Sequence, residues 1–143
     1  MNTLLSKSAK LLLIVIVFLS SFIGNVLLHE TGHYLTASMF GLNPSMYVSS
    51  PAESLNYIFE SKPIASVSFS ESASNEQTFL VGLMGPAVNL FLAVIFLVIY
   101  IESKQNKYIG KSALAAFLPS ILSFIINILP LGSTDGSVLL SLL

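Results

Sequence analysis

The chain has 143 residues, of which 54% are hydrophobic and 9% charged, with a mean hydropathy of +0.83. This composition is far more apolar than that of a soluble domain, so we expect an integral membrane protein. The formal net charge is -1 and arginine is absent, which argues against a nucleic-acid-binding surface. The lack of cysteine excludes disulfides, thiolate metal ligands and cysteine catalysis. The length predicts one domain over residues 1–143.

The first membrane span is predicted from a mainly apolar run without charged residues over residues 11–28, which follows Lys7 and Lys10. The run approaches the roughly 20 residues that cross a bilayer. A secretory signal peptide is the alternative, but the run is long for one and no clear cleavage site follows it. Apolar residues continue to Phe40, after which Gly41 and Pro44 are expected to end the helix.

A polar, serine-rich segment over residues 43–77 separates the first span from the second. Within it, apolar residues alternate with serines over residues 65–70, a period that predicts a short strand, and residues 46–49 could pair with it as a hairpin. The second span is expected over residues 79–101.

The third hydrophobic stretch begins near Ala113 and is interrupted by Pro119, Pro130 and the polar turn 132–136. A final apolar piece, residues 137–143, is too short to cross alone and would complete a broken third span. We therefore expect an all-α membrane protein with a three-span helical core, a broken third span and a short β-hairpin or strand in the first loop.

The sequence HETGH, residues 29–33, contains both histidines of the chain and lies within the apolar first helix. On a helix, His29 and His33 project from one face and can bind a single zinc ion, with Glu30 placed as general base. Charged residues are costly in a bilayer, so Glu30 indicates a function. The alternative is that these side chains only form hydrogen bonds between helices.

A third zinc ligand is expected, because catalytic zinc usually takes three protein ligands and keeps one position open. With no further histidine and no cysteine, it has to be a carboxylate. Asp135 is the candidate, since it is the only other acidic residue within a hydrophobic stretch. The alternative is that Asp135 caps a helix or forms part of a turn.

The second span carries Gly85 and Pro86, which favour a kink, and Asn89 one turn later. Asn127 is another amide in an apolar run. Taken alone, the Gly-Pro pair indicates a packing kink more often than a site, and Asn127 is equally ambiguous.

Three sequences in this order, HETGH at 29–33, GPAVN at 85–89 and NILPLGSTDG at 127–136, resemble the site-2 protease family of intramembrane zinc metalloproteases. In that family, H-E-x-x-H, G-P-x-x-N and N-x-x-P-x-P-x-x-D-G lie on successive core helices. The resemblance covers residues 11–136.

The resemblance implies zinc ligands at His29, His33 and Asp135, catalysis by Glu30, and substrate contacts from Asn89 and Asn127, with Asn89 at the substrate or the oxyanion. The chain departs from the pattern in two places. It has Gly132 where the family usually has a second proline, and Thr134 where leucine is common.

Zinc-dependent intramembrane proteolysis is the function that these residues predict. The expected partners are the lipid bilayer and a substrate membrane protein with a transmembrane segment, and no nucleic acid. The resemblance implies a multi-pass protein in the cell membrane of a prokaryote. The alternative is a non-proteolytic module that holds zinc and binds transmembrane partners. The small size and the lack of a recognisable accessory domain favour this alternative.

Two arguments about membrane orientation disagree. Because the chain crosses the membrane twice between them, the lysines at 7 and 10 and those at 104, 107 and 111 would lie on the same side of the membrane. The positive-inside rule places that side in the cytosol. The resembled family instead generally places the end of the helix carrying H-E-x-x-H toward the cytosol in bacteria.

Overall fold

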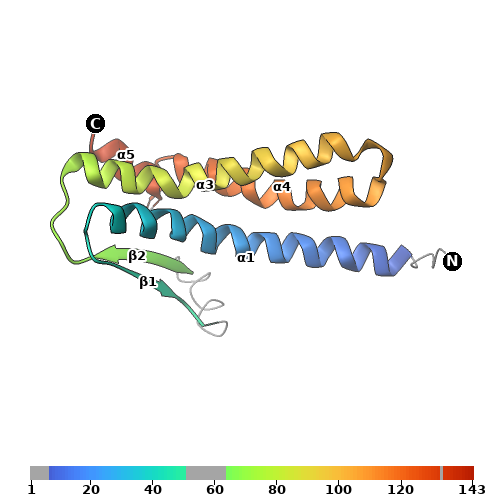
Figure 1. The fold of residues 1–143 in the computed structure, drawn as a ribbon, viewed down its shortest axis with the longest axis horizontal. Coiled ribbons are helices and arrows are strands. Elements are labelled where there is room, and N and C mark those ends of the chain that lie inside the picture. Colours follow the sequence, from blue (N-terminus) through green and yellow to red (C-terminus); the bar gives the residue numbers. More distant parts are fainter. Residues whose placement is uncertain (1–6, 51–63, 133) are drawn as a thin grey trace.

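Three long helices form the core of the protein. The computed structural model describes residues 7–50, 64–132 and 134–143. The long helices are α1 (Lys7–Met39), α3 (Asn75–Glu102) and α4 (Lys107–Ile128), accompanied by strands β1 (Pro44–Val48) and β2 (Ala65–Phe69), a short 3-10 turn (Ser103–Gln105) and α5 (Asp135–Ser141) (Figure 1). Each long helix is apolar and long enough to cross a membrane. The predicted three-span fold with a small first-loop sheet is confirmed.

Small side chains fill the centre of the helix bundle, whereas large apolar ones face outward. Ala93 on α3 and Ala113 and Ala116 on α4 are buried, while Leu11 on α1 and Phe91 on α3 are among the many exposed large residues. Membrane helices associate through such small residues, because lipid tails are as favourable to leucine as the protein interior is. The pattern fits a bundle whose outer surface contacts lipid.

Helix α1 ends at Met39, and the chain turns at Gly41, which the sequence predicted to end the helix. This glycine has a φ of +70°, a conformation that side chains with a Cβ rarely adopt. The Leu42 amide donates to the Ala37 carbonyl at 3.0 Å, and the Gly41 amide donates to the Ser38 carbonyl at 3.0 Å. The chain therefore turns sharply and enters β1 beside the helix that it has just left.

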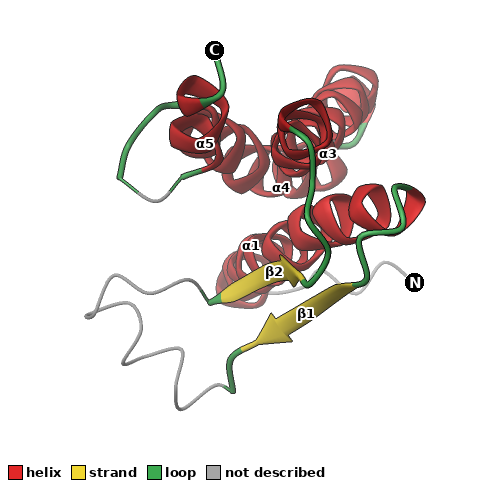
Figure 2. Cartoon of the chain, turned by 90° about the vertical axis from the view of Figure 1, so that its left-hand side faces the viewer, coloured by secondary structure: helices red, strands yellow, loops and turns green. Residues whose placement is uncertain are grey.

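The predicted hairpin is also confirmed. Strands β1 and β2 are antiparallel, and Met46 lies opposite Val67. On β2, Phe69 packs against a buried cluster of Ala37, Leu42 and Val81, which joins the sheet to α1 and α3. Figure 2 shows the two strands beside the end of α1 (Figure 2). The sheet is thereby fixed next to the helical turn that carries the two histidines.

The third span begins earlier than predicted. Helix α4 starts at Lys107, because the Asn106 side chain accepts hydrogen bonds from the amides of Tyr108 and Ile109. Pro119 lies inside this helix and does not end it. The predicted break comes after Ile128, and the chain resumes as α5, which packs against α3 and α4.

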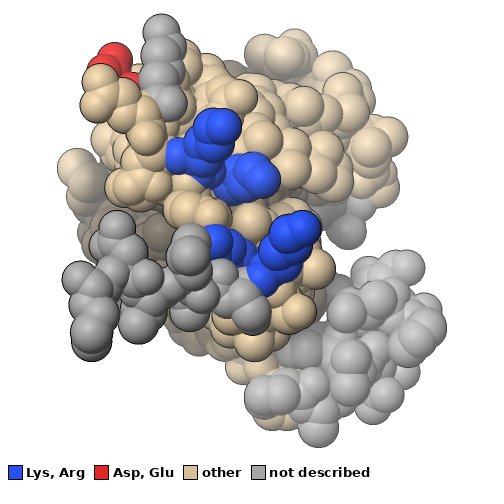
Figure 3. All heavy atoms as spheres, turned by 90° about the vertical axis from the view of Figure 1, so that its right-hand side faces the viewer, with Lys and Arg blue, Asp and Glu red and all other residues tan. Residues whose placement is uncertain are grey.

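Lysines gather at one end of the bundle. Lys7 and Lys10 begin α1, and Lys107 and Lys111 begin α4 at the same end of the molecule (Figure 3). There the Lys10 ammonium donates to the Tyr108 hydroxyl at 2.5 Å and lies 4.6 Å from the centre of its ring. The histidines lie toward the opposite end of α1. We call the two ends the lysine end and the histidine end.

Candidate metal centre

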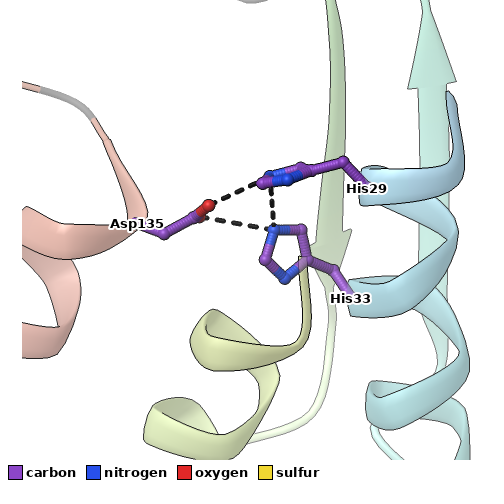
Figure 4. Close-up of side chains that lie close together, drawn as sticks. All are labelled: His29, His33 and Asp135. Carbon is purple, nitrogen blue, oxygen red and sulfur yellow. Dashed lines mark hydrogen bonds and ion pairs between the residues drawn. The ribbon is translucent and has the colours of Figure 1, made fainter. Parts of the chain in front are cut away.

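Three predicted ligands meet at the histidine end of the bundle. His29 and His33 project from one face of α1, and Asp135, the first residue of α5, faces them from across the bundle (Figure 4). The Nε2 atoms of the two histidines lie 3.0 Å apart. The Asp135 carboxylate approaches His29 Nε2 at 3.0 Å and His33 Nε2 at 3.3 Å. Both histidines are buried and Asp135 is partly buried.

These spacings suit a zinc ion. A tetrahedral zinc with bonds of about 2.0–2.1 Å holds neighbouring ligand atoms roughly 3.3 Å apart, close to the separations of the His29, His33 and Asp135 atoms. Asp135 Oδ2 is buried and lies 3.0 Å from His29 Nε2. Burying a carboxylate is costly, and a cation held by the three groups would offset that cost. The donor set of two imidazoles and one carboxylate therefore fits the metal.

A backbone carbonyl holds His33. Its Nδ1 lies 2.6 Å from the carbonyl oxygen of Val81 on α3. Because a carbonyl only accepts hydrogen bonds, this contact requires a proton on Nδ1 and leaves the Nε2 lone pair free for a metal. This contact could not be predicted from sequence, since any residue at position 81 supplies a carbonyl.

Asn89 lies behind His29 and not at the cavity. Its side chain is fully buried, and its amide nitrogen is 2.9 Å from His29 Nδ1, the ring nitrogen that faces away from Asp135. The same amide nitrogen donates to the Ser123 hydroxyl at 2.7 Å. The expected contact with substrate or oxyanion stays a prediction, and the position of Asn89 in this structure favours a contact with the ligand ring instead.

Gly85 makes room for both imidazoles. A Cβ added at this position would overlap His33 Nε2 and would lie 2.7 Å from His29 Cε1. Gly32 on α1 is similarly close to α3, where an added Cβ would lie 2.9 Å from the Met84 carbonyl oxygen. Gly85 and Pro86 were interpreted from sequence as a packing kink, but Gly85 is needed for the close approach of α3 to the histidines.

A cavity of about 380 Å³ opens beside the three ligands. Glu30 and Asn127 line it together with Asp135, and one wall is formed by β2. Asn127 itself donates to the Ser123 backbone carbonyl at 3.0 Å and to its hydroxyl at 3.3 Å. Of the two asparagines predicted to contact substrate, Asn127 is therefore the one that reaches the cavity.

The turn before Asp135 is closed by Thr134, one of the departures from the family pattern. Its hydroxyl donates to the Leu129 carbonyl at 2.5 Å and accepts from the Leu131 amide at 3.1 Å. Gly132 has a φ of +61°, which a proline could not adopt. Thr134 is also the N-cap residue of α5, so Asp135 does not have the capping role that was its alternative, and its carboxylate faces the histidines.

Comparison with known proteins identifies one family. The model of peptidase family M50 matches residues 17–109, about two thirds of the chain. The matched part contains HETGH and GPAVN, and Asp135 lies beyond it. No curated protein and no solved structure matches the chain significantly.

Proposed function

The chain belongs to peptidase family M50, the site-2 protease family of membrane metalloproteases, and we propose that it hydrolyses peptide bonds of membrane proteins at a zinc ion. His29, His33 and Asp135 would hold the ion. The observation that carries the proposal is the convergence of these three ligand atoms beside a cavity that Glu30 also lines. Zinc, when bound, supplies a Lewis acid that polarises a carbonyl and makes water more acidic.

Glu30 is the proposed general base and acid. It follows His29 directly and faces the same cavity, so its carboxylate is within the space where water and a peptide would meet. It would accept a proton from the attacking water and return it to the leaving nitrogen of the peptide bond. No other acidic side chain of the described residues lines this cavity apart from the ligand Asp135.

The substrate would bind as a strand along β2. In an antiparallel pair, successive residues alternate between facing the partner and facing away. The Ser49 amide donates to the Ile64 carbonyl at 2.9 Å, so the backbone groups of Ile64 point toward β1. By alternation, the backbone groups of Val67, three residues later, point away from β1. Val67 also lines the cavity. The Val67 amide contacts the Glu30 carboxylate, so an extended peptide would pair with this edge of β2 by taking the place of that contact.

The proposed partners and location follow from the membrane fold. Three helices are apolar and long enough to cross a membrane, which supports the proposal that the substrates are membrane proteins with a transmembrane segment. Strand pairing would also unwind a helical substrate, whose peptide bonds are otherwise covered by its own hydrogen bonds. We propose a multi-pass protein of a prokaryotic cell membrane.

The test compares the wild type with Glu30→Gln, purified in detergent and analysed for zinc and for cleavage of a reconstituted transmembrane substrate. We expect both proteins to contain zinc, with cleavage reduced by roughly 10²–10⁴-fold in the variant. Cleavage by a zinc-containing Glu30→Gln protein would refute the role of Glu30. Zinc without cleavage in the wild type, against a panel of transmembrane substrates, would favour the non-proteolytic zinc module.

A further inference from the structure

We propose that Asn89, held by Ser123, is a positioning residue that sets the tautomer and orientation of His29 for metal binding. The inference rests on the proposed zinc site. It assigns Asn89 to the face of His29 opposite the metal, and therefore gives it a different role from the expected contact with substrate or oxyanion.

The two histidines differ in what lies behind them. The Val81 carbonyl behind His33 can only accept a hydrogen bond, so it permits one neutral tautomer, the one with Nε2 free. The amide of Asn89 behind His29 can present either an oxygen or a nitrogen. The tautomer of His33 is thus set by a backbone carbonyl, whereas that of His29 depends on the Asn89 side chain, whose amide can turn.

The orientation of the amide decides whether His29 can bind a metal. With the Asn89 nitrogen toward Nδ1, as at the 2.9 Å contact, Nδ1 accepts and the ring proton is on Nε2, where it faces Asp135. A metal at Nε2 requires the proton on Nδ1, which then needs an acceptor. Turning the amide brings its oxygen to Nδ1 and satisfies that need.

Ser123 is suited to both orientations. Its hydroxyl lies 2.7 Å from the Asn89 amide atom that contacts His29, and a hydroxyl can accept from a nitrogen or donate to an oxygen. In the structure Asn89 Oδ1 is buried without a partner. If the amide turns, Nδ2 becomes the unpaired atom in place of Oδ1, so the number of unpaired atoms stays the same. The orientation is therefore determined by the contacts with His29 and Ser123, and zinc binding favours the one with Oδ1 toward His29.

Burial separates this role from a catalytic one. Asn89 is fully buried and is absent from the cavity wall, whereas Asn127 lines the cavity and bonds to the same Ser123. An oxyanion donor must reach the reacting carbonyl. The Asn89 amide reaches the ligand ring, so its effect passes through His29.

The test measures zinc affinity by competition with a chromophoric chelator in detergent, using Asn89→Leu and Asn89→Asp. Leucine has nearly the same shape but no acceptor, so we expect affinity to fall about 10–100-fold. Aspartate keeps the acceptor and removes the donor, so affinity should be no weaker than in the wild type. A donor to an oxyanion would give a different result, because both substitutions would stop cleavage and leave zinc affinity unchanged.

The matched control is Asn25→Leu. Asn25 is a buried amide one turn before His29 on α1, and its nitrogen donates to the Ser21 carbonyl at 2.7 Å, with no bond to a proposed ligand. Its zinc affinity should equal that of the wild type. Circular dichroism of the zinc-free proteins checks folding, and if Asn89→Leu does not fold, Asn89→Ala, which also lacks the acceptor, takes its place.

Two results would overturn the inference. They are wild-type zinc affinity in folded Asn89→Leu, and zinc affinity in Asn89→Asp reduced below that of the wild type. A wild-type protein that binds no zinc would instead refute the proposed zinc site itself, so the two failures are distinguishable.

Discussion

The histidine end and the lysine end of the bundle are held together in different ways. At the histidine end, buried and partly buried polar groups on α1, α3 and α4 contact one another, as in the series His29, Asn89 and Ser123. At the lysine end, α1 meets α4 through an exposed contact between Lys10 and Tyr108. Hydrogen bonds shielded from water are stronger and more specific in geometry than exposed ones. The difference indicates that the helices are aligned most strictly where the ligands must meet.

The largest expected effect comes from filling the space beside the imidazoles. In Gly85→Ala, the new Cβ would overlap His33 and press on His29, so the ligands must move apart. Loss of a group that hydrogen-bonds to a metal ligand lowers metal affinity roughly 10–100-fold, and we expect zinc affinity to fall by more than this. Overpacking should also destabilise the fold by about 1–3 kcal/mol. Chelator competition and thermal unfolding in detergent measure the two effects.

Gly24→Ala is the matched control for this substitution. Gly24 is also on a long helix, but nothing lies within 4 Å of an added Cβ. Its zinc affinity should be unchanged. Equal zinc affinity in Gly85→Ala and Gly24→Ala would mean that the histidine end is less strictly packed than we infer.

The open edge of β2 gives the next largest effect, on cleavage alone. Val67→Pro removes an amide that faces away from β1 and contacts the Glu30 carboxylate, so the hairpin should persist while the bond to Glu30, or to a substrate strand that replaces it, is lost. A net loss of about 0.5–1.5 kcal/mol corresponds to roughly two- to tenfold slower cleavage. Zinc content should stay at the wild-type level. Val67→Ala retains the amide, and cleavage by Val67→Pro at the same rate as by Val67→Ala would argue against strand pairing.

A smaller effect is expected from the turn that carries Asp135. Thr134→Val keeps the shape of the side chain but removes the hydroxyl bonded to Leu129 and Leu131. Zinc affinity should fall several-fold, since each lost hydrogen bond is worth about 1 kcal/mol. Ser141→Ala, which removes a hydroxyl bonded to the Val138 carbonyl within α5, is the control. If both variants bind zinc equally well, the turn does not position Asp135.

The smallest effect is predicted at the lysine end. Lys10→Ala removes the contact with Tyr108, which is exposed and should contribute less than about 1 kcal/mol to stability. Thermal unfolding should shift slightly, and zinc affinity should not change. A clear loss of zinc affinity would show that the two ends are coupled, contrary to the comparison above.

Much of the fold could be predicted from sequence because hydropathy and turn residues are local signals. The three spans, the turn at Gly41 after α1 and the pairing of β1 with β2 follow from them. The start of α4 at Lys107 was missed, because lysines near a span resemble a loop while the capping by Asn106 depends on geometry. Within the site, the proximity of His29, His33 and Asp135 was expected from the motifs.

The supporting contacts of the site could not be predicted in the same way. The Val81 carbonyl has no side-chain signature, and a serine at position 123 is ordinary in a membrane helix. The role of Gly85 depends on how closely α3 approaches α1, which sequence spacing does not define. These contacts arise between helices, so they become visible only when the helices are placed in space.

Zinc K-edge X-ray absorption of the purified wild-type protein would show whether His29, His33 and Asp135 hold one zinc ion. We expect one zinc ion with two imidazole nitrogens from His29 and His33 and oxygen ligands, at about 2.0–2.1 Å, including the carboxylate of Asp135. In Asp135→Ala, zinc content after dialysis against a weak chelator should fall to background. A wild-type protein without zinc, or a zinc ion bound by fewer than two imidazoles, would contradict the account.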